Sequence, residues 1–252
     1  MTWQWLHRLG SPKWFYEKTT TLTRVALVAA CALIVVGLIW GLLFAPEHAT
    51  QKHSYRIIYI HVPTSFLSMA GFFFMAVCGA IGLIWRTKMS FILMQVAAPV
   101  GAVFTFLSLF TGAVWGKPTW GTYWEWDARI TFQLILFFLY LAIIALNNAY
   151  RNRQAADKVC AVLAIVGSVN IPLIYWSVEW WFTLHQTATF KMSGKSGIHS
   201  SMAYPLIWMI LSTYLLYLAL ILQHARVEIL RREASATWVR AILDKYHGGP
   251  KL

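Results

Sequence analysis

Two histidines, His61 and His185, stand where their side chains could act as a pair of metal ligands. His61 lies about one turn inside a long apolar run, immediately before Val62 and Pro63. An ionisable group at such a depth is a candidate functional residue. His185 follows the aromatic run Trp180-Trp181, and a helix there would place Trp181 and His185 on one face.

Neutral imidazole is the common axial ligand of haem iron, and two imidazoles on opposing elements could hold a planar macrocycle between them. Each residue also has a simpler interpretation. His61 could be hydrogen-bonded to a neighbouring helix or lie at the membrane interface, and the run around His185 could be an amphipathic helix anchored by Trp. Zinc is a weaker hypothesis, because no Cys, Asp or Glu cluster accompanies the pair.

A second candidate is the segment 115–127, WGKPTWGTYWEWD, where tryptophan is unusually dense. An aromatic belt at a membrane interface also gathers Trp, but it requires neither glycine nor an acidic residue. Glycine allows a backbone to approach a flat ligand closely, and aromatic faces can stack on its ring. We therefore select the following candidate residues: Trp115, Gly116, Trp120, Gly121, Trp124, Trp126 and Asp127.

Two arginines, Arg56 and Arg129, flank these segments and are candidate contacts for the propionates of a haem. A guanidinium can bind a carboxylate through two parallel hydrogen bonds. The alternative is an arginine at a helix end whose charged head extends toward water.

The elements that must position these residues are membrane helices. Hydrophobic residues make up 59% of the chain and charged residues 12%, about half the charged share of an ordinary soluble domain. Six charge-free runs are each long enough to cross about 30 Å of hydrocarbon. The sequence predicts an all-α polytopic membrane protein of one domain, 1–252, with a charged tail over 228–252. The expected helices are 21–44, 57–85, 91–114, 129–150, 159–177 and 203–227.

Lys and Arg residues concentrate on the side of the two termini, which predicts that both termini face the cytoplasm. The net charge of +12 is then explained by attraction to anionic lipid, and no basic segment resembles a nucleic-acid-binding fold. The chain lacks the GxxxxGK[ST] motif of an ATPase. Its three cysteines form neither CxxC nor CxxCH, so no thiol redox motif or c-type haem attachment site is present.

Several segments resemble a known family. The run WGKPTWGTYWEWDAR is similar to the tryptophan-rich motif of the haem handling protein (WWD) family of cytochrome c maturation. Three others, SYRIIYIHVP (54–63), APVGAVFTFLSLFTGAVWGKP (98–118) and SVEWWFTLHQ (177–186), resemble its CcmC branch, haem exporter protein C. The similarity covers nearly the whole chain and weakens at the tails and over 187–201. Glu125 departs from the motif, where an apolar residue is expected.

The resemblance implies a mechanism. His61 and His185 would ligate the iron of haem b, and the segment 115–127 would present the edge of the macrocycle. The haem would pass to the membrane-tethered chaperone CcmE, with CcmD as a small helper and CcmA and CcmB as an ATP-binding cassette unit. The site would face the periplasm from the bacterial inner membrane.

Three functions compete. The favoured one is a haem-binding delivery subunit without turnover of its own. The second is a haem lyase, but the related lyases are larger or carry additional haem-ligating histidines within their helices, which are lacking here. The weakest is a permease, which predicts polar residues at mid-depth in several helices. The sequence assigns no role to His48, His53, His199 or Glu125.

Overall fold

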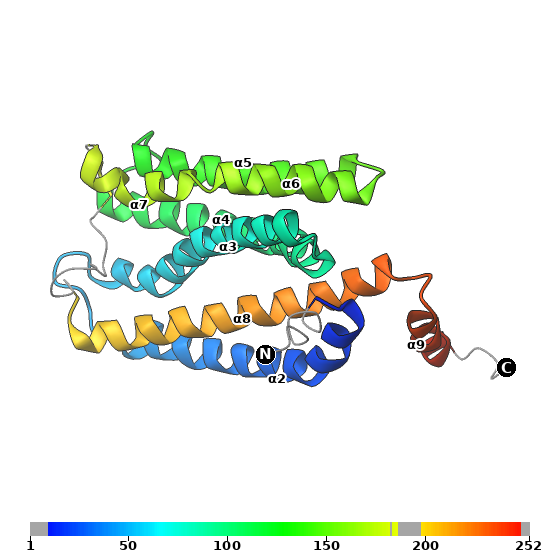
Figure 1. The fold of residues 1–252 in the computed structure, drawn as a ribbon. Helices are drawn as coiled ribbons and strands as arrows, with labels where there is room; N and C mark the ends of the chain where they lie inside the picture. The colour runs from blue at the N-terminus through cyan, green and yellow to red at the C-terminus, as the bar shows by residue number, and fades with distance from the viewer. Residues whose placement is uncertain (1–9, 182, 186–197, 248–252) are drawn as a thin grey trace, which may run out of the picture.

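The computed structural model describes residues 10–181, 183–185 and 198–247. Its main helices are α2 (Pro12–Ile39), α3 (Ile58–Trp85), α4 (Lys88–Trp120), α5 (Ala128–Ala149), α6 (Arg153–Gly167), α7 (Asn170–Trp180), α8 (Ser200–Arg232) and α9 (Thr237–His247). Figure 1 shows α3 and α4 between two outer layers, with α2 and α8 on one side and α5, α6 and α7 on the other. The loops α2–α3 and α4–α5 and the start of α8 lie at one end of this bundle, which we call the site end.

Six helical segments of the described chain are long and apolar enough to cross a membrane, which confirms the predicted polytopic helical fold. Several predicted boundaries were wrong. The first helix begins at Pro12 rather than at residue 21, because Ser11 caps it by accepting a hydrogen bond from the Trp14 amide. Proline suits the first helical position, since its missing N–H would have no partner there.

Helix α4 is also longer than predicted and extends to Trp120. The first half of the segment 115–127 is therefore helical, where a loop was expected. Gly121 ends the helix in the left-handed conformation, with φ of 85°, and its amide donates to the Lys117 carbonyl at 3.0 Å. Glycine adopts this conformation without the steric cost that other residues incur.

The predicted fifth helix, 159–177, is two helices, α6 and α7, separated by a turn at Ser168 and Val169. Helix α7 ends at Trp180, and Trp181 is extended with φ of −127° and ψ of 156°. The proposed helix carrying Trp181 and His185 on one face is therefore wrong. His185 belongs instead to a non-helical segment beyond α7.

At the end opposite the site end, a buried charged network ties α4, α6 and α8 together. The Arg232 guanidinium donates to both carboxylate oxygens of Asp157 at 3.1 Å and to Glu228 at 2.8 Å. Gln95 accepts from Arg232 and donates to Asp157. Arg232 and Asp157 expose only 14% and 9% of their side chains, so water can replace few of these contacts.

We expect Asp157→Ala to destabilise the fold by about 3 kcal/mol, because the substitution leaves a buried guanidinium without its bidentate partner. The effect is measured as the midpoint of heat-induced loss of helical circular dichroism in detergent. Lys88→Ala is the matched control, because it breaks an ion pair with Glu233 whose lysine is 74% exposed, and such pairs contribute about 1 kcal/mol or less. Equal midpoints for the two variants would contradict the assigned role of the network.

Candidate haem site

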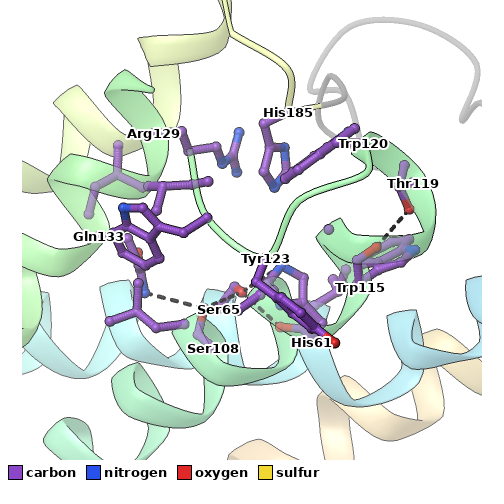
Figure 2. Close-up of a pocket in the computed structure, with 18 of the residues that line it drawn as sticks. His61, Ser65, Ser108, Trp115, Thr119, Trp120, Tyr123, Arg129, Gln133 and His185 are labelled. Carbon is purple, nitrogen blue, oxygen red and sulfur yellow. Dashed lines mark hydrogen bonds between the residues drawn. The ribbon is translucent and has the colours of Figure 1, made fainter. Parts of the chain in front are cut away.

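A large cavity opens at the site end between α3, α4, α5 and α7 (Figure 2). It encloses about 1130 Å³, counting the part that opens to the exterior. Aliphatic and aromatic side chains provide most of its wall, and the polar exceptions are few: His61, Ser65, Ser108, Thr119, Arg129, Gln133 and His185. An apolar cavity with a few convergent polar groups is typical of a binding site for a large apolar ligand.

His61 lies in the first turn of α3 and points into this cavity. Its Nδ1 is 3.1 Å from Thr111 Oγ1 on α4, and its Nε2 is 3.5 Å from Ser65 Oγ. The Trp115 ring packs edge-on against the imidazole, with ring centres 5.6 Å apart. The ring of His61 is therefore held between two helices before any ligand arrives.

His185 faces His61 across the cavity, as Figure 2 shows. Their ring centres are 6.4 Å apart and the ring planes are inclined by 35°. For imidazoles on opposite sides of one metal ion, a bond of about 2 Å and a nitrogen-to-centre distance of about 1.1 Å give ring centres roughly 6 Å apart. The observed ring-centre distance of 6.4 Å is close to this value.

Asp127 connects the tryptophan-rich segment to His185. Its Oδ1 accepts a hydrogen bond from the Ile130 amide at 2.8 Å and so caps the start of α5. Its Oδ2 accepts from the hydroxyl of Thr183, and Thr183 Oγ1 accepts in turn from the His185 amide at 3.1 Å. One carboxylate thus fixes both a helix start and the segment that carries His185.

The tryptophans divide into three groups. Trp115 is buried and donates from Nε1 to Gln51 Oε1 at 2.9 Å. Trp120 and Trp124 line the cavity, and the Trp120 ring centre is 6.0 Å from that of His185. Trp126 is 74% exposed and outside the cavity wall, where it packs edge-on against Trp124.

The two predicted glycines allow backbone arrangements around the cavity that a side chain would hinder. A Cβ on Gly116 would lie 3.0 Å from the Thr122 carbonyl and 3.1 Å from the Trp120 ring, so glycine allows the α4–α5 connection to fold closely over the helix. Gly121 supplies the positive φ at the helix end. Glu125 beside them is exposed.

The two predicted arginines have different surroundings. Arg129 lines the cavity next to His185 (Figure 2), and its buried Nη1 has no hydrogen-bond partner among the described residues. Arg56 is not part of the cavity wall. It donates to the carbonyls of Leu42 and Ala45 at 2.7 and 2.9 Å, where the π-helical segment η1 (Trp40–Phe44) ends. We therefore retain only Arg129 as a candidate propionate contact.

The remaining histidines of the site end have local contacts. His48 Nδ1 is 3.4 Å from the Thr50 amide, and its ring stacks on Tyr55. His53 Nε2 lies 2.7 Å from Glu47 Oε1, and His199 caps α8.

Sequence reasoning missed three polar residues of the cavity wall, Ser65, Ser108 and Gln133, and also missed Thr111, which contacts His61. Each is an isolated polar residue within an apolar run, as is common in membrane helices, so type alone did not mark them. Their spacing could have done so, because Ser108 and Thr111 fall one turn apart on α4.

Comparisons with known proteins identify the family of this chain. The family model for heme exporter protein C matches residues 5–240. The chain belongs to this family. Heme exporter protein C of Haemophilus influenzae is 44% identical over 240 residues, covering 95% of this chain and 98% of the relative. The protein of that name from Escherichia coli K12 is 43% identical over 243 residues, covering 96% and 98%, and one from Bradyrhizobium diazoefficiens is 42% identical over 224 residues, covering 89% and 85%.

Proposed function

We propose that this protein binds haem in the cavity at the site end and passes it on during cytochrome c maturation. The observation that carries the proposal is the facing pair His61 and His185, with ring centres 6.4 Å apart across an apolar cavity. The family supports it, because the relatives are named heme exporter protein C. The cargo is haem b, and the role is transfer without covalent chemistry of the protein's own.

The chain's residues have distinct tasks in this function. His61 and His185 supply the axial nitrogens, and the Trp120 and Trp124 rings cover a flat apolar ligand. Arg129 offers a buried cation without a hydrogen-bond partner at Nη1 to an anionic propionate. Trp126, which is exposed and packs edge-on against Trp124, marks the rim at which a partner would reach the edge of the haem ring.

The proposal also includes the protein that accepts the haem and the orientation of this chain in the membrane. We place the site end at the periplasmic face of the bacterial inner membrane, with both termini in the cytoplasm, as the distribution of Lys and Arg predicts. The haem passes to the chaperone CcmE, in a system that includes CcmD and the ATP-binding cassette unit of CcmA and CcmB. Lipid surrounds the exposed apolar faces of the outer helices.

The proposal is tested by titrating the purified protein with haemin in mild detergent and recording the visible spectrum. A saturable, low-spin, six-coordinate spectrum is expected, followed by transfer of the haem to a soluble CcmE domain added in excess. A well-folded protein that binds no haem at micromolar concentration would overturn the function. Binding without transfer would overturn the proposed acceptor alone.

Arg129→Gln is expected to weaken haem binding by about tenfold, because it removes one charge-assisted hydrogen bond to a carboxylate, a contribution of about 1.5 kcal/mol. Arg56→Gln is the matched control, since its guanidinium donates to backbone carbonyls outside the cavity. It should lower thermal stability and leave haem affinity unchanged. The comparison is repeated with a haem whose propionates are esterified, for which Arg129→Gln should bind as the wild type does.

A further inference from the structure

Behind His61, next to the cavity, lies a threonine of α4 whose hydroxyl contacts the imidazole ring. Thr111 Oγ1 lies 3.1 Å from His61 Nδ1. The same hydroxyl donates to the Leu107 carbonyl one turn back along α4, at 2.6 Å. A hydroxyl carries one proton and two lone pairs, and here the proton is directed to the backbone. Thr111 therefore presents a lone pair to Nδ1, and Nδ1 must carry the ring proton.

The other ring nitrogen, Nε2, faces no committed donor among the described contacts. Its hydrogen-bonding neighbour is Ser65 Oγ at 3.5 Å, and that hydroxyl donates to the His61 carbonyl at 2.8 Å. Ser108 lies 2.6 Å from Ser65 Oγ, and the Gln133 amide donates to Ser108 at 3.3 Å and to Ser68 at 2.8 Å. The amide protons of Gln133 thus point to Ser108 and Ser68. The Ser108 proton points to Ser65, and the Ser65 proton points to the His61 carbonyl. None of these protons is directed at His61 Nε2, so its lone pair is available.

Gly112, the neighbour of Thr111, allows the imidazole to reach this position. A Cβ on Gly112 would lie 3.0 Å from His61 Cε1, the carbon between the two ring nitrogens. A side chain there would push the ring away from α4 and lengthen the contact with Thr111. Two consecutive residues of α4 thus position the imidazole ring. Thr111 contacts the ring through its hydroxyl, and Gly112 leaves space for the ring because it has no side chain.

We propose that Thr111 is a positioning residue that fixes His61 as the Nδ1–H tautomer and so presents Nε2 to the iron. This inference rests on the proposed function and deepens it. An oxygen that accepts from the distal N–H of a metal-binding histidine sets its tautomer and orientation and increases electron donation to the metal. The histidine would thereby stabilise ferric iron more than an imidazole without that acceptor.

The tautomer is tested first in the protein without haem, by nitrogen-15 NMR of histidine-labelled samples. The His61 ring is assigned from the resonances that disappear in His61→Gln. The wild type and Thr111→Ser should show the proton on Nδ1, whereas Thr111→Val should lose that preference. A wild-type His61 ring with its proton on Nε2 would overturn the inference without any reference to haem.

The second test measures haem affinity and the midpoint potential of the bound haem. Thr111→Val should bind haem about tenfold more weakly, which is the range seen when a hydrogen-bond partner of a metal ligand is lost. The midpoint potential of its bound haem should be more positive than that of the wild type. Thr111→Ser should restore both. The matched control is Thr105→Val, since Thr105 is also a buried threonine of α4 and donates to the Gly101 carbonyl.

Wild-type affinity and potential in Thr111→Val would overturn the inference alone, provided that His61→Ala weakens binding in the same assay. Unchanged haem binding in His61→Ala would instead remove the proposed function, together with any role for Thr111. If Thr111→Val does not fold, the NMR result on the wild type still decides the tautomer.

Discussion

Alanine at His61 or at His185 is expected to convert bound haem from a six-coordinate, low-spin species to a five-coordinate, high-spin one. Each variant loses one axial nitrogen of a pair whose ring centres lie 6.4 Å apart. We expect the affinity of each variant for haem to fall by more than the roughly 10–100-fold that is lost when a hydrogen-bond partner of a metal ligand is removed. The double variant should show only the nonspecific binding of a hydrophobic ligand to an apolar cavity. Visible absorption during haemin titration reports both the spin state and the affinity.

His53→Ala is the matched control for this comparison. His53 lies at the same end of the bundle, but it pairs with Glu47 and is not part of the cavity wall. Its removal should leave the spectrum of the bound haem unchanged. A low-spin spectrum that persists in both single cavity variants would show that other residues ligate the iron.

Alanine at Asp127 should have the next largest effect, because one carboxylate performs two tasks. Loss of the cap on α5 should cost about 1 kcal/mol of stability. Loss of the hydrogen bond from Thr183 should release the segment that carries His185 and lower haem affinity by about 10–100-fold. Thermal unfolding and haemin titration measure the two effects separately.

Thr183→Val separates these tasks. It removes the hydroxyl that joins Asp127 to the His185 amide and leaves the Asp127 cap on α5 in place. We expect weakened haem binding at wild-type thermal stability. Wild-type haem affinity in Thr183→Val, alongside weak binding in Asp127→Ala, would show that the cap alone positions the cavity.

The membrane helices were predictable because six apolar runs leave the chain no other stable fold in a bilayer. Helix ends were less predictable. The first helix starts at Ser11 and Pro12 within a polar stretch, where hydropathy gives no signal but capping chemistry does. The end of α4 at Gly121 was missed because Pro118 and two glycines indicate a loop, although a proline in the last turn removes a single backbone hydrogen bond.

Within the candidate site, residue type identified the two histidines, one arginine and the tryptophans that line the cavity. His61 was chosen as an ionisable group inside an apolar run, and Arg129 as an arginine that flanks a candidate segment; both line the cavity. Arg56 was chosen on the same grounds but contacts the carbonyls of a π-helical segment, which hydropathy cannot reveal. Thr111 was missed because its role depends on which partner receives its proton, and that partner is known only when two helices are placed together.

The two facing histidines are anchored to different kinds of backbone. In the proposed function, this difference sets the order in which the two histidines would release haem. His61 belongs to a helix packed against α4, so its withdrawal would require two membrane helices to separate. His185 belongs to a non-helical segment beyond α7, and the Thr183 hydroxyl joins that segment to Asp127. In the proposed function, a docking protein that displaced this segment from Asp127 would move His185 before His61, and the helical half of the cavity would stay assembled as a template for the next haem.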